Sequence, residues 1–195
     1  MNFPENIKIV AAIKNRNEND LEKIYSSGIT NFGENRLQEH LNRKDILKNK
    51  KISWHFIGRL QTNKLKEISK KFHFIHSISR MKEIRTIYKS GPPYPICLIQ
   101  INLGDESKSG IEARKLTLLL KKAKKETPEI PLRGLMTMPP YTKKPEKNRL
   151  WFREVKKLGE KNFKNPLLSM GTTQDWEIAF SEGSNILRIG RALFE

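Results

Sequence analysis

The feature that most constrains the fold of this chain is an alternation of short apolar runs with longer amphipathic stretches. The runs lack a polar face, which is typical of strands buried on both sides, as in a parallel sheet covered by helices. Eight strands are predicted, at residues 8–14, 31–34, 53–58, 72–78, 96–103, 132–138, 167–171 and 186–190.

Amphipathic stretches separate these strands and predict seven helices. Their apolar residues recur three and four positions apart, so each helix has one face to bury. In the first helix, Asp20 is a candidate N-cap, and Gly28 ends the helix. The predicted helices cover about residues 21–27, 36–47, 64–68, 80–89, 112–125, 146–162 and 175–181. The sixth is expected to bury the stripe Leu150, Trp151, Val155 and Leu158.

Strands that alternate with helices in this way form a parallel sheet with helices on its faces. Eight repeats predict closure into a (β/α)8 TIM-like barrel, a single domain over residues 1–195. The alternative is a doubly wound open sheet, but no Gly-x-Gly-x-x-Gly motif follows the first strand. No helix is predicted after the last strand. We therefore expect the seam between the first and last strands to be an exposed apolar patch or to be covered by a partner chain.

The formal net charge of +17 raises the question of a nucleic-acid partner. The basic residues are dispersed, and no zinc-finger spacing or RNA-recognition motif accompanies them, so we expect no specific nucleic-acid partner. No apolar stretch reaches the roughly 20 residues that span a membrane. The single cysteine, Cys97, lies in an apolar run. These features predict a cytoplasmic protein with no membrane partner, disulfide or metal site.

Functional side chains of a (β/α)8 barrel lie at the C-terminal ends of its strands. Lys14 ends the first predicted strand, and two interpretations of it are open. It is either a solvated strand end or a partly desolvated amine with a lowered pKa, which can form a Schiff base with an aldehyde. Other candidates at strand ends are Asn35, His55 and Met136.

Two stretches near the C-terminus predict an anion site. The first, residues 169–173, leads from a strand into a helix, so its hydroxyl and backbone N–H groups can surround a phosphate. The second is Arg188-Ile189-Gly190 at the end of the last strand, where the glycine allows close approach. Either alone could be only a tight turn. Barrel closure places both beside Lys14, and a phosphate site next to an amine suggests pyridoxal 5′-phosphate (PLP).

Several sequence blocks occur in the same order as in a known family and cover nearly the whole chain. They are residues 10–14, 32–39, 54–64, 100–103, 108–110, 133–136, 168–171 and 188–191. In these blocks the chain resembles the pyridoxal phosphate homeostasis protein family (the YggS/PROSC group), whose fold is similar to the barrel domain of bacterial alanine racemase.

The resemblance implies roles for individual residues. Lys14 matches the Schiff-base lysine, and Arg188 matches the arginine that faces the pyridine nitrogen. Because a guanidinium is a permanently charged donor, that nitrogen would stay unprotonated and the ring would be a weaker electron sink. The other positions that match cofactor contacts are Ser169, Gly171, Thr172, Ile189, Gly190, Asn35, His55 and Met136.

The chain departs from the family pattern at several positions. Ile13 and Arg16 replace a serine and a lysine on either side of Lys14, and Glu195 replaces a glycine. Thr172-Thr173 replaces a Met-Ser pair and keeps a hydroxyl. The chain begins at the first strand, about one helix later than most members, so we expect a barrel shortened at its N-terminus.

The resemblance implies a non-catalytic protein that holds PLP as a Schiff base on Lys14. It would buffer the cofactor or deliver it to PLP-dependent apo-enzymes, as a monomer or weak homodimer. The alternative is a PLP-dependent amino-acid racemase, which needs an opposing base from a second domain. Tyr141 is the one tyrosine we nominate for that role. An RNA-binding protein would rest on charge alone, and a hydrolytic triad of Ser169, His55 and Asp175 lacks a nucleophile-elbow sequence.

Overall fold

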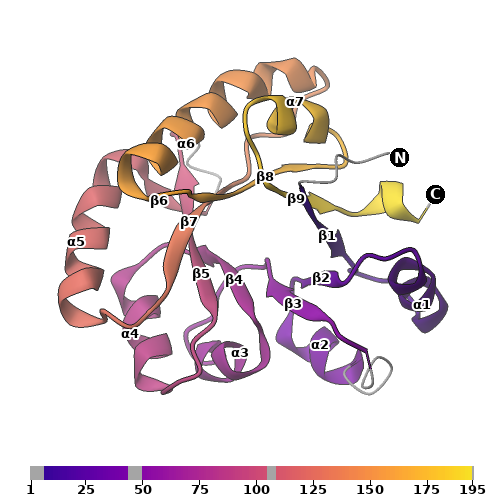
Figure 1. Cartoon of the computed structure of the whole chain (residues 1–195), viewed down its shortest axis with the longest axis horizontal. Helices are drawn as coiled ribbons and strands as arrows, with labels where there is room; N and C mark the ends of the chain where they lie inside the picture. Colours follow the sequence, from indigo (N-terminus) through magenta and orange to yellow (C-terminus); the bar gives the residue numbers. More distant parts are fainter. Residues whose placement is uncertain (1–6, 44–49, 105–108, 195) are drawn as a thin grey trace.

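The computed structural model describes residues 7–43, 50–104 and 109–194. Parallel strands form the centre of the molecule and helices surround them (Figure 1). The strands are β1 (Lys8–Ala12), β2 (Asn31–Glu34), β3 (Ser53–Phe56), β4 (Phe74–Ile78), β5 (Ile96–Asn102), β6 (Ile111–Glu112), β7 (Leu132–Thr137), β8 (Leu167–Thr172) and β9 (Ile186–Ile189). The α-helices are α1 (Glu18–Ser26), α2 (Leu37–Arg43), α3 (Leu65–Lys71), α4 (Met81–Lys89), α5 (Leu116–Glu126), α6 (Arg149–Asn162) and α7 (Trp176–Ser181).

The sheet closes on itself. Its order is β4-β3-β2-β1-β9-β8-β7-β5-β6, and an additional β4–β5 pairing joins the two ends. All pairings are parallel, and the two-residue β6 only extends the edge of β5. The predicted (β/α)8 TIM-like barrel is therefore confirmed, with one predicted strand at each of its eight main positions.

Successive side chains of each strand point alternately into and out of the barrel. Val10, Leu98, Met136 and Ile186 form one buried cluster, which lies inside. The larger apolar core lies between the strands and the helices, and it includes Ile75, Ile99 and Leu187. The strands are covered on both faces, and this is why they appear in the sequence as continuous apolar runs.

Two details of the helices differ from prediction. The N-cap of α1 is Asn17, and Asp20 is the third helical residue of a capping box, so the prediction of Asp20 as N-cap is wrong. In α6, Leu150 is 68% exposed, and the buried residues are Phe152, Val155 and Gly159. The predicted end of the second helix, residues 44–47, lies outside the described residues.

Of the two outcomes expected for the seam, an exposed apolar patch is wrong for the described residues, and coverage by a partner chain stays a prediction. A 3-10 turn at Arg191–Leu193 follows β9, and Leu193 and Phe194 pack against the cluster that contains Leu21 and Phe32. The large apolar side chains that are exposed lie elsewhere, at Leu118, Met138, Tyr141 and Leu150. The described end of the chain therefore covers part of the seam, while Ile7 and Ile9 stay half-buried beside a surface hollow.

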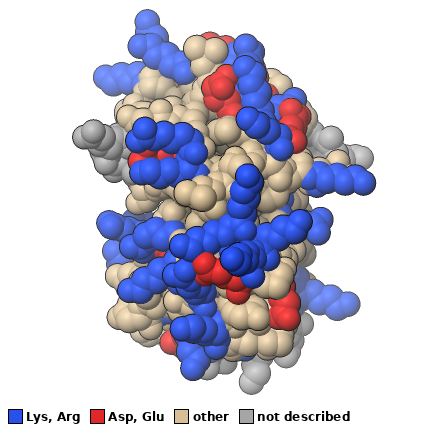
Figure 2. All heavy atoms as spheres, turned by 90° about the vertical axis from the view of Figure 1, so that its left-hand side faces the viewer, with Lys and Arg blue, Asp and Glu red and all other residues tan. Residues whose placement is uncertain are grey.

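Basic side chains cover much of the α4 and α5 side of the molecule, with acidic side chains among them (Figure 2). Some are paired, such as Arg85 with Glu126 at 2.6 Å. Within the described ranges, no helix is long and apolar enough to cross a membrane.

Candidate functional site

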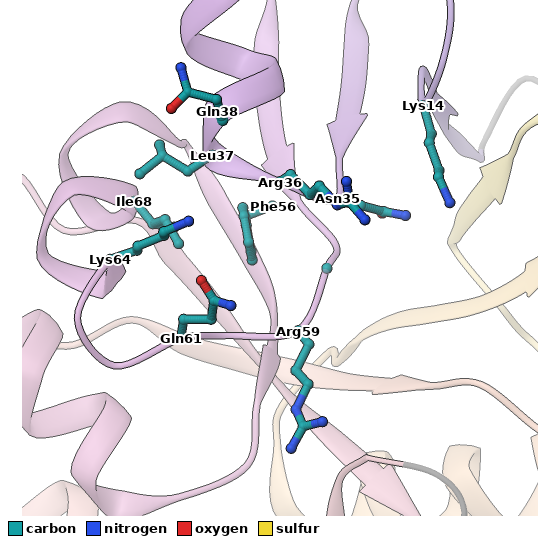
Figure 3. Close-up of a pocket in the computed structure, with 11 residues that line it drawn as sticks. Lys14, Asn35, Arg36, Leu37, Gln38, Phe56, Arg59, Gln61, Lys64 and Ile68 are labelled. Carbon is teal, nitrogen blue, oxygen red and sulfur yellow. The ribbon is translucent and has the colours of Figure 1, made fainter.

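Lys14 lies at the mouth of the barrel, two residues beyond the end of β1. Ile13 before it is fully buried in the outer layer, so alternation turns Lys14 toward the barrel axis. Asn15 after it has a φ of 58°, a left-handed conformation that asparagine tolerates. The Lys14 side chain is exposed and points toward the last strand (Figure 3). The Schiff-base interpretation expected a partly desolvated amine. In the structure, the Lys14 side chain is exposed to solvent instead.

A buried ion pair holds the loop that follows Lys14. The Arg43 guanidinium donates to the carboxylate of Glu34, which is fully buried, and to the carbonyl of Arg16 at 3.1 Å. Burial raises the pKa of Glu34 to about 7, although the Arg43 charge opposes this shift. The pair therefore ties the end of β2 and helix α2 to the turn that presents Lys14.

Arg188 is the centre of a polar network inside the barrel. Its Nη1 donates to the carbonyl and to the hydroxyl of Ser169, both at 2.6 Å, and its Nη2 donates to the Thr137 carbonyl at 2.8 Å. These bonds use three of the five guanidinium N–H groups. No carboxylate of the described residues forms an ion pair with Arg188. The guanidinium is thus a buried cation, and two of its N–H groups donate to no described residue.

The network continues from Ser169 through two histidines. Ser169 Oγ lies 2.9 Å from Nδ1 of His76, and Nε2 of His76 lies 2.9 Å from Nδ1 of His55. Nε2 of His55 lies 3.1 Å from Oδ1 of Asn31. Arginine only donates and an amide oxygen only accepts, so the protons can be assigned. Ser169 donates to His76, His76 donates to His55, and His55 donates to Asn31.

Both histidines are neutral in this arrangement. Burial lowers the pKa of His55 to about 3, and the charge of Lys8 adds to the effect. Burial also lowers the pKa of His76 well below its usual value, and His55 and Arg188 lower it further. Burial lowers the pKa of Arg188 to about 10, so the guanidinium keeps its charge at neutral pH. Within this network, the positive charge is therefore carried by Arg188 and not by the two histidines.

The turn after β8 is built around Asp175. Its Oδ1 accepts from the backbone N–H of Thr172 at 2.8 Å and from the Thr172 hydroxyl at 3.0 Å, and its Oδ2 accepts from Asn148. Gly171 has a φ of 90°, and a Cβ there would lie 2.6 Å from the Cβ of Ala179. The Thr172 hydroxyl and Gly171 thus shape the turn and its packing against α7.

Thr173 and Gly190 join the turn to the last strand. The backbone N–H of Gly190 donates to Oγ1 of Thr173 at 3.2 Å. A Cβ on Gly190 would meet nothing closer than Ala12, at 3.9 Å. The space beside Gly190 is therefore open at the mouth of the barrel, next to strand β1.

The structure divides the predicted site residues into two sets. Those at the mouth are Lys14, Asn35, Thr172 and Gly190, with Arg188 directed into the interior network. The buried ones are His55, Met136, Ser169, Gly171 and Ile189. The Ser169 hydroxyl is engaged by Arg188 and His76, and Ile189 packs outward in the larger core. Of this buried set, His55, Met136 and Ser169 therefore lie in the barrel interior beneath the mouth.

Sequence reasoning missed Asn31, His76 and Thr137 as members of this site, whereas Thr173 lies in the turn 169–173 that it had singled out. The signal for His76 was its strand phase, because it is an inward position on β4, as His55 is on β3. The hydrolytic triad is not formed, since His55 bonds Asn31 and His76 while Asp175 bonds Thr172 and Asn148. Among the described residues, no group of three or more His, Cys, Asp or Glu side chains is placed to hold a metal ion.

The barrel has a lysine at the mouth of its first strand. Its last strand carries an arginine and ends at a glycine beside open space. These features are those of a barrel of the alanine racemase type. The sequence agrees, because the family model described as "Alanine racemase, N-terminal domain" matches residues 4–195. Within that group, the chain belongs to the pyridoxal phosphate homeostasis protein family.

This membership rests on close relatives. The pyridoxal phosphate homeostasis protein of Aquifex aeolicus is 39% identical over 96% of this chain and 86% of its own length. That of Pseudomonas aeruginosa is 34% identical over 98% of this chain and 85% of its own length. The resemblance seen in the sequence blocks is thereby confirmed.

Solved structures agree with the fold. PipY of Synechococcus elongatus, solved with PLP bound, has a TM-score of 0.89 at 25% identity and covers 99% of this chain and 94% of its own. The alanine racemase of Corynebacterium glutamicum has a TM-score of 0.74 at 16% identity, over 97% of this chain but 56% of its own. At that identity the racemase shares the barrel fold alone.

Proposed function

We propose that this protein binds PLP at the mouth of the barrel, as a Schiff base on Lys14, and acts in PLP homeostasis. The observation that carries the proposal is the buried Arg188 guanidinium, which lacks a carboxylate partner among the described residues and keeps unused donors. A buried charge is costly unless it is paired, so an anionic ligand with an acceptor nitrogen suits this position.

The remaining residues of the mouth fit the same ligand. The open space beside Gly190, bordered by Thr173, suits a phosphate, and Lys14 of the neighbouring strand supplies the amine. When bound, PLP supplies an aldehyde that condenses with an amine and a ring that withdraws electrons. Arg188 would donate to the ring nitrogen, and Ser169, His76 and His55 hold the guanidinium in place. Asn35 borders Lys14 at the mouth.

The proposal is for a non-catalytic cytoplasmic protein that buffers PLP or delivers it to PLP-dependent apo-enzymes. An arginine beside the ring nitrogen weakens the ring as an electron sink, which favours holding the cofactor over using it. The relatives that carry the homeostasis name support this assignment. Tyr141, nominated as a racemase base, is 70% exposed and lines a separate pocket with Met138 and Pro140. We further propose a monomer or weak homodimer, without a nucleic-acid partner.

An absorption spectrum tests the proposal. Wild-type protein mixed with PLP should develop the band of a protonated Schiff base near the edge of the visible range, and Lys14→Ala should abolish it. The control is Lys66→Ala, which removes an exposed lysine of α3 and should leave the band unchanged. The absence of a band in the wild type would refute the proposal. Racemisation of alanine at ordinary enzyme rates would favour the racemase instead.

A further inference from the structure

A second cavity opens at the barrel mouth next to Lys14. It has a volume of about 650 Å³ and is bordered by the loops after β2 and β3 and by helix α3 (Figure 3). Neither Arg188 nor Gly190 lines it. Lys14 therefore lies between two spaces. One is the open space beside Gly190 on the last strand, which we call the cradle, and the other is this cavity beside the second and third strands.

The rim of the cavity is cationic. Besides Lys14, it carries Arg36, Arg59 and Lys64, all exposed, and no aspartate or glutamate lines it. Arg36 has a weak contact with Glu39, at 3.9 Å. Arg59 and Lys64 have no ion pair among the described residues. Four positive groups around one hollow, with no acid among them, attract a ligand with several negative charges.

The floor of the same cavity is apolar. It consists of Leu37, Phe56 and Ile68, which are 5%, 2% and 1% exposed. The amide side chains of Gln38 and Gln61 also line the cavity. A ligand that fits both levels has a flat apolar part to lie on the floor and an anionic group to reach the rim. The volume falls in the range of small-molecule sites.

The cavity walls are fixed by the fold. A Cβ on Gly58 would lie 2.0 Å from the carbonyl oxygen of Asn35, so the loops after β2 and β3 touch through their backbones. The backbone N–H of Ile57 also donates to the carbonyl of Glu34 at 2.9 Å. These contacts set the spacing between Arg36 and Arg59, one on each loop.

We propose that this cavity is a second, non-covalent site for an aromatic phosphate monoester, the chemical class to which PLP itself belongs. The cationic rim, with Arg59, Lys64 and Arg36, would attract the phosphate, and the ring would lie on the apolar floor beside Phe56. The proposal rests on the proposed function in that it makes the protein a holder of two cofactor molecules, one covalent on Lys14 and one exchangeable beside it.

The experiment fills the first site before it measures the second. Wild-type protein is loaded with PLP, reduced with borohydride so that the ligand is fixed on Lys14, and titrated calorimetrically with pyridoxine 5′-phosphate, which has no aldehyde. One further equivalent should bind. Arg59→Gln and Lys64→Gln should each weaken this binding about tenfold or more, since each removes a charged hydrogen-bond donor. Lys66→Gln, a matched lysine outside the cavity, should leave it unchanged.

Two further titrations examine the ligand class. Pyridoxine and inorganic phosphate should each bind the loaded protein far more weakly than pyridoxine 5′-phosphate. Inorganic phosphate that binds equally tightly would overturn the proposal, because the apolar floor would then contribute nothing. No second equivalent, or one insensitive to both rim substitutions, would overturn it as well.

Failure of the first site remains distinguishable from failure of the second. If no Schiff base forms on Lys14, the unloaded protein is titrated with pyridoxine 5′-phosphate. Binding that depends on Arg59 and Lys64, and not on Gly190→Val in the cradle, supports the cavity even then. Binding that depends on Gly190 alone refutes it.

Discussion

Arg188 and Ser169 are joined twice inside the barrel, because Nη1 of Arg188 donates to both the carbonyl and the hydroxyl of Ser169 at 2.6 Å. The hydroxyl in turn donates to His76, so the cation is held by dipoles and neutral rings in place of a carboxylate. An arginine fixed in this way keeps its charge for a ligand. Its position is set by a network of residues on five other strands, and two of its N–H groups donate to no described residue.

Loss of His76 is expected to destabilise the fold strongly. His76→Ala leaves a buried cavity, an unpaired Nδ1 on His55 and a Ser169 hydroxyl without its acceptor. Together these should cost about 3 kcal/mol of unfolding free energy, measured by urea denaturation. The matched control is His73→Ala, whose Nδ1 accepts only from the exposed backbone N–H of Trp54 at 3.0 Å. That variant should lose about 1 kcal/mol. Equal losses would contradict a supporting role for the network.

The two buried histidines predict a loss of stability in acid. Their pKa values are lowered by burial, that of His55 to about 3, so between that pH and about 6.5 the unfolded chain binds protons that the folded one does not. The stability that they contribute is present above pH 6.5 and is lost as the pH falls below it. In this range, each histidine lowers the unfolding free energy by about 1.4 kcal/mol for every pH unit of acidification.

The variant His76→Gln isolates this effect. It removes one of the two protons, so its unfolding free energy should fall less steeply than that of the wild type between pH 6.5 and 5. The measurement is a series of urea titrations across that range. Parallel curves for the two proteins would show that His76 titrates normally in the folded state.

Gly171, which is buried, and Gly190, at the mouth, should respond differently to the addition of a methyl group. Gly171→Ala places a methyl group 2.6 Å from the Cβ of Ala179 at a φ of 90°, and should cost about 1–3 kcal/mol of unfolding free energy. Gly190→Ala places its methyl group in open space, 3.9 Å from Ala12, and should cost less stability. It should weaken PLP binding, measured by titration of the Schiff-base band, but not the binding of pyridoxal, which lacks the phosphate. A Gly190 variant that weakens both ligands equally would argue against a phosphate cradle there.

The barrel and the mouth could be predicted because their signals are local. Continuous apolar runs mark strands covered on both faces, and strand ends mark the mouth, so Lys14, Arg188 and Gly190 were placed side by side by closure alone. The direction of the Ser169 hydroxyl was not predictable in the same way. It depends on His76, which lies 93 positions away in the sequence, across the barrel interior.

The errors arose where the local sequence fits more than one arrangement. Asn17 and Asp20 are both good N-caps, and the capping box that uses both decides for Asn17. Leu150, Trp151 and Phe152 are consecutive, so the inner face of α6 depends on packing that the pattern does not contain. The seam was misjudged because the final turn is too short to show a periodicity, although it covers part of the seam between β1 and β9.

The Glu34–Arg43 pair near Lys14 predicts a pH effect of opposite sign to that of the histidines. The folded pKa of Glu34 is raised by burial to about 7, so its contribution to stability is present below about pH 4.5 and is lost as the pH rises to 7. Glu34→Gln removes this dependence.

Arg43→Gln removes the opposing charge and the contact with the Arg16 carbonyl, and leaves a buried carboxylate unpaired. Arg43→Gln should therefore be more destabilising at pH 8 than at pH 5, by about 1–3 kcal/mol in urea titrations. The control Glu67→Gln, at an exposed acid 4.0 Å from Lys71, should show no such difference. A loss for Arg43→Gln that is equal at both values would mean that Glu34 is already ionised at pH 5.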